Sequence, residues 1–267
     1  MKKYLVIGSG GFVGKSLCAY LENELYDVTK FDIKDGSAYD ASDVWLDLSS
    51  YDVVLFLAWD VGGANYLYRD DTQFDQLHNN LDLLKNVFTQ YEQVDKSKTK
   101  MVFISSQLAE NCDSVYGVTK RLGEVWCSLV GGLSLRLWNV YGPKEESTQK
   151  SHVISDFIDQ ALTTDKIVMQ TNGEEKRQFI FIKDVYDAIQ YGIKKNMHGV
   201  FDVTTYQWVR VADIACAIAE ILHVPFHFGT KTSTTQDVMI KGRIPNWQPK
   251  VNIYDGIDYA IQQHKAI

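Results

Sequence analysis

The chain has 267 residues, of which 45% are hydrophobic and 23% are charged, and its formal net charge is −7 at pH 7. This length and composition suit one large α/β domain, alone or with a small lobe. The acidic balance without a basic cluster argues against nucleic acid as a partner, and no apolar run suits a signal peptide or a membrane span.

The cysteines lack the paired spacing and the neighbouring histidines of a metal site. They are Cys18, Cys112, Cys127 and Cys216. This pattern predicts free thiols in a reducing cytoplasm and no bound metal.

The chain begins with the pattern of a dinucleotide-binding unit. Residues 3–7 predict a short strand, residues 8–14 are rich in glycine, and residues 15–24 have the spacing of an amphipathic helix. Gly8 permits the tight turn, Gly11 lets the backbone approach a pyrophosphate, and Gly14 permits close helix packing. Because phosphates bind at helix N-termini, the predicted cofactor contacts here are Gly8, Gly11, Phe12 and Val13.

The second predicted strand, residues 27–32, ends on a carboxylate, Asp32. An acidic residue about twenty positions after the glycines accepts hydrogen bonds from the adenosine ribose and repels a 2′-phosphate. The sequence therefore predicts NAD rather than NADP as the cofactor.

Strand and helix patterns alternate along the rest of the chain. Strands are predicted at residues 44–48, 53–57, 101–105, 133–138, 179–182 and 200–203, and helices at 74–90, 115–129, 153–162, 183–194 and 211–222. Such alternation predicts an α/β fold of the Rossmann type, a doubly wound parallel sheet whose ligands bind at the carboxyl ends of the strands. Residues 1–140 and 178–204 are expected to form the NAD-binding domain. Insertions in residues 141–177 and 205–267 are expected to form a small substrate lobe.

A tyrosine and a lysine four residues apart suggest hydride-transfer chemistry. Tyr116 and Lys120 share one face of a predicted helix, and Ser106 ends the apolar run before it. A lysine at this spacing is expected to favour the phenolate and to lower its pKa. Tyr116 is then the predicted general acid/base. Ser106 is expected to bond the same substrate oxygen, and Lys120 to bind the nicotinamide ribose.

These features together resemble the extended short-chain dehydrogenase/reductases, of the nucleotide-sugar epimerase and dehydratase type. The resemblance covers nearly the whole chain and includes residues 136–143, 177–184 and 246–250. It implies further cofactor contacts from Asp47, Leu48, Leu57, Ala58 and Asn80. It also implies a nucleotide-sugar site that includes Asn139, with Arg177 and Arg243 as candidates for the diphosphate.

Two departures from this resemblance narrow the chemistry. The 4,6-dehydratases carry an Asp-Glu pair directly after the catalytic Ser/Thr, whereas this chain has Gln107 and Leu108. Residues 61–63 and 151–154 are locally similar to GDP-fucose synthase, which implies that His152 is catalytic and contacts substrate. The partner cysteine of that enzyme aligns with Leu108, and Cys112 lies four residues further on.

The leading hypothesis is an NAD-dependent nucleotide-sugar epimerase that acts at C4 of the sugar. A 4-keto-sugar reductase or 4-dehydrogenase is the alternative, and a dinucleotide-sensing binding protein is a third. A homodimer is expected through residues 74–90 and 115–129, where Leu83, Leu84 and Val87 offer apolar surface. Trp59, Trp138 and Trp247 are candidates for stacking on the cofactor or the base.

Overall fold

The computed structural model describes residues 1–61, 69–143, 152–232, 235 and 238–265. Its centre is a six-stranded sheet in the order β10-β5-β4-β3-β1-β2, and every neighbouring pair is parallel. The strands are β1 (Lys3–Ile7), β2 (Asp27–Phe31), β3 (Val53–Phe56), β4 (Lys100–Ser106), β5 (Leu133–Leu137) and β10 (Gly199–Val203). This confirms the predicted doubly wound sheet.

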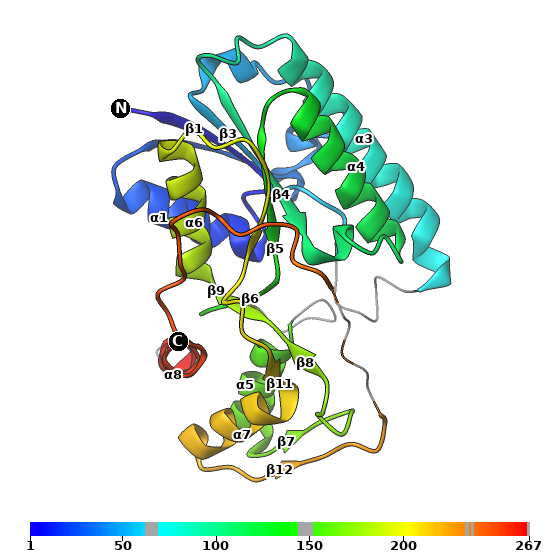
Figure 1. The fold of residues 1–267 in the computed structure, drawn as a ribbon, viewed down its shortest axis with the longest axis vertical. Coiled ribbons are helices and arrows are strands. Elements are labelled where there is room, and N and C mark those ends of the chain that lie inside the picture. The colour runs from blue at the N-terminus through cyan, green and yellow to red at the C-terminus, as the bar shows by residue number, and fades with distance from the viewer. Residues whose placement is uncertain (62–68, 144–151, 233–234, 236–237, 266–267) are drawn as a thin grey trace.

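Helices cover both faces of this sheet (Figure 1). On one face lie α1 (Phe12–Asn23) and α6 (Ile182–Lys194), and on the other α3 (Gln73–Glu92) and α4 (Val115–Leu129). Tyr4 and Val6 of β1 belong to the core that contains the buried residues of α1. Leu5 and Ile7 belong to the core that contains those of α3. Successive side chains of a strand point to opposite faces, so a strand covered on both sides is apolar throughout.

The remaining helices and strands follow from β5 onward. They are β6 (Asn139–Tyr141), α5 (Val153–Thr164), β7 (Ile167–Val168), β8 (Lys176–Arg177), β9 (Phe179–Phe181), β11 (Val209–Arg210), α7 (Val211–Leu222), β12 (Phe226–His227) and α8 (Ile253–Lys265). Short 3-10 turns lie at Ile33–Asp35, Ser37–Tyr39, Leu48–Ser50, Asp70–Thr72 and Gln107–Ala109. The helices α5 and α7 pack together below the large sheet in Figure 1, with β7, β8, β11 and β12 beside them. The exact limits of a substrate lobe stay a prediction.

Three short two-stranded sheets build this lower part. The pairs β6–β9 and β7–β12 are parallel, and the pair β8–β11 is antiparallel. The predicted strand at residues 179–182 therefore exists as β9, but it pairs with β6 and lies outside the six-stranded sheet. The first helix also begins earlier than predicted, at Phe12, directly after the glycine loop.

The strand predicted at residues 44–48 is wrong. This segment forms no strand and leads into the 3-10 turn at Leu48–Ser50. Side chains of α3 satisfy its backbone, because Asn86 donates to the carbonyl of Val44 (2.9 Å) and Gln90 accepts from the amide of Leu46. The apolar residues Val44, Leu46 and Leu48 pack against the core below α3. Their alternation with polar residues therefore reflects burial on one side and not pairing in a sheet.

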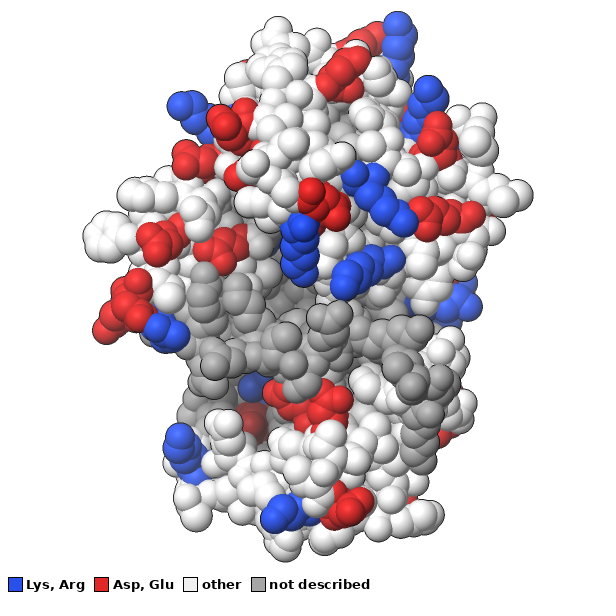
Figure 2. Space-filling model, turned by 180° about the vertical axis from the view of Figure 1, so that it is seen from behind, with Lys and Arg blue, Asp and Glu red and all other residues white. Residues whose placement is uncertain are grey.

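The surface carries charges of both signs. Figure 2 shows the molecule from behind the view of Figure 1, with acidic side chains interspersed with basic ones over the upper part of that face. Within the described ranges, no helix is long and apolar enough to cross a membrane. The same ranges contain no group of three His, Cys, Asp or Glu side chains placed to hold a metal ion. All four cysteines are free.

Candidate active site

A cleft lies at the carboxyl ends of the parallel strands. The order of the strands reverses between β1 and β3, which is the topological switch point where open α/β sheets bind ligands. Two cavities of about 480 and 660 Å³ lie there. They share lining residues and thus form one continuous cleft, and the shared residues are Gly8, Gly11, Phe12, Leu57, Trp59, Val61 and His152.

The glycine loop forms the floor between the two cavities. A Cβ atom on Gly8 would lie 2.4 Å from the amide nitrogen of Ala58, and one on Gly14 would lie 2.1 Å from the carbonyl oxygen of Gly8. A Cβ on Gly11 would meet nothing closer than the Gly8 carbonyl oxygen at 3.7 Å, which is an ordinary van der Waals contact. No side chain caps the start of α1, and Phe12 and Val13 line the cleft. The first-turn N–H groups of a helix are suited to bind a pyrophosphate.

Asp32 lies at the far end of the second cavity, where β2 ends. One carboxylate oxygen accepts the amide of Gly10 at 2.8 Å, and the other accepts the amide of Lys34 at 3.0 Å. These bonds fix the orientation of the carboxylate, which keeps further lone pairs for ribose hydroxyls. Ala58 lines the same cavity.

The predicted triad lies at the wall of the first cavity. Ser106 ends β4, whereas Tyr116 and Lys120 lie in the first two turns of α4. Ser114 caps this helix by accepting the amide of Gly117 at 3.1 Å. The ammonium of Lys120 donates to the carbonyl of Ile104 at 2.7 Å. The fold thus brings the predicted triad into one cavity, together with His152, the fourth residue predicted to be catalytic.

Burial controls the proton affinities of this pair. It raises the pKa of Tyr116 to about 12, and a hydrogen bond with Ser106 acts in the opposite direction. Burial also lowers the pKa of Lys120 well below its usual value, and the carboxylate of Glu124 opposes this. The expectation that Lys120 lowers the pKa of Tyr116 is therefore wrong for this arrangement. The ammonium bonds to Ile104 instead and lies 5.8 Å from the centre of the tyrosine ring.

A buried ionic network fixes α4 behind the triad. Arg136 of β5 donates from Nε to Oε1 of Glu124 (2.6 Å) and from Nη2 to Oε2 (2.8 Å). Ser105 also donates to Oε1 of Glu124, at 2.6 Å. The third nitrogen of Arg136 bonds Glu110, and this bond lowers the pKa of the Glu110 carboxyl. These bonds connect the adjacent strands β4 and β5 to α4, the helix that carries Tyr116.

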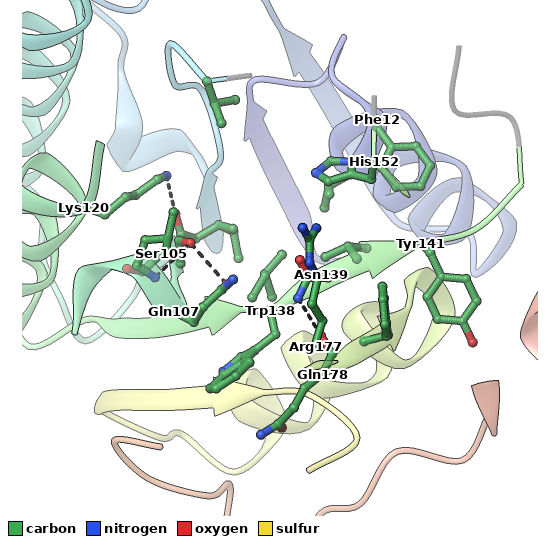
Figure 3. A pocket seen from close by; sticks show the side chains of 18 of the residues that line it. Phe12, Ser105, Gln107, Lys120, Trp138, Asn139, Tyr141, His152, Arg177 and Gln178 are labelled. Carbon is green, nitrogen blue, oxygen red and sulfur yellow. Dashed lines mark hydrogen bonds between the residues drawn. The ribbon is translucent and has the colours of Figure 1, made fainter. Parts of the chain in front are cut away.

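The predicted substrate residues approach the cavity from other elements. Figure 3 shows Asn139 and Arg177 across the pocket from Lys120. Asn139 donates to the carbonyl of Gln178 at 2.7 Å. Arg177 lies on β8, and burial lowers its pKa. His152 precedes α5 and lines both cavities.

Comparison with known proteins identifies the family. The profile of the NAD dependent epimerase/dehydratase family matches residues 4–203. The chain belongs to this family. Enzymes of this family use NAD, and the roles predicted for the glycine loop and for Asp32 in binding it stay predictions.

Three of the proteins that resemble this chain illustrate its similarity to known members of the family. A UDP-N-acetyl-alpha-D-glucosaminuronate decarboxylase from Bacillus cytotoxicus is 23% identical over 322 aligned positions, which cover 100% of this chain and 98% of the relative. A UDP-N-acetylglucosamine 4-epimerase from Methanobrevibacter ruminantium has a similar structure (TM-score 0.80, 19% identity, 99% and 98% of the two chains). So does a UDP-glucose 4-epimerase from Thermus thermophilus in complex with NAD (TM-score 0.72, 18% identity, 98% and 99%). At these identities the structural likeness supports the fold alone.

Four predicted site residues of this family member lie outside the cleft lining, namely Asp47, Leu48, Asn80 and Arg243. Asn80 is buried and holds the loop after β3, because it accepts the amide of Asp60 (2.8 Å) and donates to its carbonyl (3.2 Å). Asp47 accepts the amide of Ser49 in its 3-10 turn, and Leu48 is buried in the core. The guanidinium of Arg243 lies 4.3 Å from the ring centre of Tyr206. Their contacts with cofactor or substrate stay predictions.

The positions that separate this chain from the dehydratases do line the cavity. Gln107 and Leu108 belong to its wall, whereas Cys112 does not and donates to the carbonyl of Ala109 at 3.3 Å. Of the three candidate tryptophans, Trp59 and Trp138 line the cavity, and Trp247 is buried in the core.

Sequence reasoning missed lining residues from the lower part of the fold, among them Glu175, Lys176, Trp208 and Val238. Trp208 packs edge-on against Trp138, with ring centres 5.7 Å apart. Glu175 had a readable signal, because it stands two positions before Arg177 in an extended segment and alternate residues share a face. Trp208 and Val238 carry no motif, and the tertiary fold alone brings them here.

Proposed function

We propose that this protein is an NAD-dependent nucleotide-sugar epimerase that acts by hydride transfer at C4 of the sugar. The observation that carries the proposal is one continuous cleft that joins Asp32 and the glycine loop to Ser106 and Tyr116. Bound NAD supplies the hydride acceptor and donor for such chemistry. The relatives named above are enzymes of UDP-sugars by their names, which supports the substrate class.

The side chains of the cavity supply the proton chemistry. Tyr116 accepts the proton of the C4 hydroxyl as this carbon is oxidised, and it returns the proton when the 4-keto sugar is reduced on the other face. Ser106 bonds the same oxygen and opposes the rise in the pKa of Tyr116. Lys120 lies one turn further along α4, where its ammonium can bond a cofactor ribose after leaving the carbonyl of Ile104.

Dehydration finds no support in this cavity. Leu108 lines the wall directly after Gln107 and cannot transfer a proton. A 4-keto-sugar reductase is the second candidate. Residues 151–154 resemble GDP-fucose synthase, and a catalytic role of His152 by that resemblance requires it to lie in the cleft, as it does.

The deciding test follows a deuterium label at C4 of UDP-glucose and UDP-N-acetylglucosamine. An epimerase that recycles its cofactor converts each sugar to its C4 epimer, keeps the deuterium at C4 and needs no added NADH. Denaturation of the purified protein then releases near-stoichiometric NAD. Transfer of the deuterium from C4 to added NAD, with oxidation of the sugar, and release of an empty protein would support the 4-dehydrogenase or 4-keto-sugar reductase instead. Binding of NADH without turnover of any sugar would favour a dinucleotide sensor.

Replacement of Tyr116 by phenylalanine tests the assigned acid/base. We expect turnover to fall by about 10²–10⁴-fold, with dissociation constants for NAD and UDP changed little. Tyr254→Phe, at an exposed position of α8, serves as the matched control and should behave as wild type. Near-normal turnover of Tyr116→Phe would remove the phenol from the mechanism.

Of the two helices expected to form the homodimer, α3 offers less apolar surface than predicted. Leu84 and Val87 are fully buried in the core below α3 and offer no apolar surface. We propose that the dimer forms through the other expected helix, α4, which carries an apolar stripe. This stripe is exposed at successive turns and consists of Val118, Leu122, Val125 and Leu129, with exposed fractions of 48%, 40%, 49% and 80%.

Sedimentation velocity tests this dimer. Residues three and four apart share one helix face, so the stripe is continuous and a second copy can bury it. Val125→Lys should convert a dimer to a monomer at micromolar concentration. Met239→Lys, which changes an exposed apolar residue elsewhere, should leave the dimer intact. A wild-type monomer would refute the dimer itself.

A further inference from the structure

The ammonium of Lys120 lies over the face of a tryptophan ring. Its Nζ atom is 3.8 Å from the ring centre of Trp59 and 5.0 Å from that of Phe103. The ring centre of Tyr116 is more distant, at 5.8 Å. A cation over an aromatic face is attracted by the quadrupole of the ring, most strongly for an indole and where water is excluded. Of these three rings, Trp59 is therefore the one that interacts most strongly with the charge.

The ring of Trp59 is held in place by its surroundings. Asn80 of α3 accepts the amide of Asp60 at 2.8 Å and donates to the carbonyl of Asp60 at 3.2 Å, which fixes the loop directly after Trp59. The indole packs edge-on against Phe103 (5.6 Å between ring centres) and in a tilted arrangement against Phe56 (6.2 Å). Two neighbouring strands and one helix thus determine the position of the indole.

The other neighbours of Lys120 compensate its charge only in part. The carbonyl of Ile104 accepts one N–H at 2.7 Å, whereas an ammonium has three to donate. Glu124, one turn further along α4, also favours the charged form, but both its oxygens are bonded to Arg136. Burial acts against the charge and lowers the pKa of Lys120. It also raises the pKa of Tyr116 to about 12 and so favours the uncharged phenol, which leaves the indole face as a close contact that favours the ammonium.

Trp59 lines both cavities, and Lys120 lines the first of them. We propose that Trp59 is a positioning residue for Lys120, and that its indole face holds the ammonium charged and in place in the cavity wall beside Tyr116. This inference rests on the proposed function, in which Lys120 bonds a cofactor ribose. It adds the residue that keeps the lysine charged for this bond, because a charged donor forms the stronger hydrogen bond.

Titration of Lys120 by nuclear magnetic resonance tests the contact. Lysine with an isotope-labelled Cε atom reports its own protonation, and the signal that Lys120→Met lacks is that of Lys120. Trp59→Met removes the ring but keeps an apolar side chain, and it should move the titration midpoint to lower pH by about 0.4–1.5 pH units. Trp59→Phe keeps a weaker ring and should fall between this variant and wild type. Trp45→Met, the same change at a position that is 67% exposed, should titrate as wild type.

The direction of the change separates this role from simple packing. If Trp59 only fills space, its replacement lets water reach the ammonium, and the midpoint rises toward the usual pKa of lysine. A midpoint that stays in place or rises in either variant of Trp59 would overturn the proposal. Trp59→Phe keeps an aromatic side chain in the same place, so it carries the test if Trp59→Met does not fold.

The pH dependence of turnover gives a second readout. The proposed function needs a charged Lys120, so the alkaline limb of kcat/KM should move to lower pH in Trp59→Met together with the lysine titration. A limb that stays in place while the lysine titration moves would exclude Trp59 from a positioning role in turnover. The titration itself needs no substrate, so a wild type that converts no nucleotide sugar refutes the proposed function and not the contact between Trp59 and Lys120.

Discussion

Replacement of Arg136 by methionine tests how the triad helix is held in place. Arg136 is fully buried, and its guanidinium forms a bidentate pair with Glu124 of α4 at 2.6 and 2.8 Å. Methionine fills a similar volume without charge, so the buried Glu124 carboxylate loses both bonds to the guanidinium and keeps the Ser105 hydroxyl and the more distant Arg121 and Lys120. The expected effect is a loss of stability from an uncompensated charge.

The size of this loss follows from the burial. Removal of one partner of a buried ion pair costs about 3–5 kcal/mol. An unfolding entropy of about 2.1 cal/mol/K per residue gives roughly 0.56 kcal/mol/K for 267 residues, or about 1.8 °C per kcal/mol. Arg136→Met should therefore melt about 5–9 °C below wild type.

Differential scanning calorimetry measures these shifts with two companions. Arg121→Met removes a partly exposed guanidinium 3.4 Å from the same carboxylate and should cost less than about 1 kcal/mol. The double variant Arg136→Met with Glu124→Met removes both charges and should melt above Arg136→Met alone. The reasoning is refuted if Arg136→Met melts within 2 °C of wild type, or if the double variant is the less stable of the two.

Three further predictions concern the cleft. Gly14→Ala places a Cβ 2.1 Å from the Gly8 carbonyl and should lower the melting temperature, whereas Gly11→Ala should spare it and weaken NAD binding in titrations; equal melting of the two variants would contradict this. Asp32→Ala should raise the NADP-to-NAD affinity ratio by removing repulsion of a 2′-phosphate, and an unchanged ratio would exclude this role. Burial lowers the pKa of Lys120, so between this lowered pKa and about 10.4 the unfolded chain binds a proton that the folded protein has released. Over that pH range the free energy of unfolding of the wild type, relative to that of Lys120→Met, should rise by up to about 1.4 kcal/mol per pH unit. A pH-independent difference between the two proteins in denaturant unfolding would contradict this sign.

Local rules predicted most of the nucleotide-binding half. The strand, glycine turn and helix at residues 3–24 follow from chain geometry, since only glycine fits beside Ala58 and beneath α1. The spacing of Tyr116 and Lys120 placed both in one cavity because a helix repeats every 3.6 residues. Neighbours in sequence determine these features, so the sequence can be read directly.

Long-range packing determined what the sequence reading lacked. The alternation at residues 44–48 resembled a strand, yet its backbone bonds go to Asn86 and Gln90, more than 40 positions away. The apolar surface assigned to Leu84 and Val87 is interior, because a helix pattern does not tell which apolar face meets the sheet. Trp208 lies in the cavity wall because β11 and α7, which follow it directly, pack there, and no local motif predicts this position.

The same long-range burial explains why the tyrosine did not have the pKa that its spacing suggested. The low-dielectric wall favours the neutral forms of both Tyr116 and Lys120, so it raises one pKa and lowers the other. Burial therefore favours the phenol form of Tyr116, and the proposed use of this residue as a base requires a positive charge nearby. The pyridinium of oxidised NAD carries such a charge, whereas the reduced form does not. The proton affinity of Tyr116 would then fall with the oxidised cofactor and rise with the reduced one, which matches the direction of proton transfer in each half of an epimerisation.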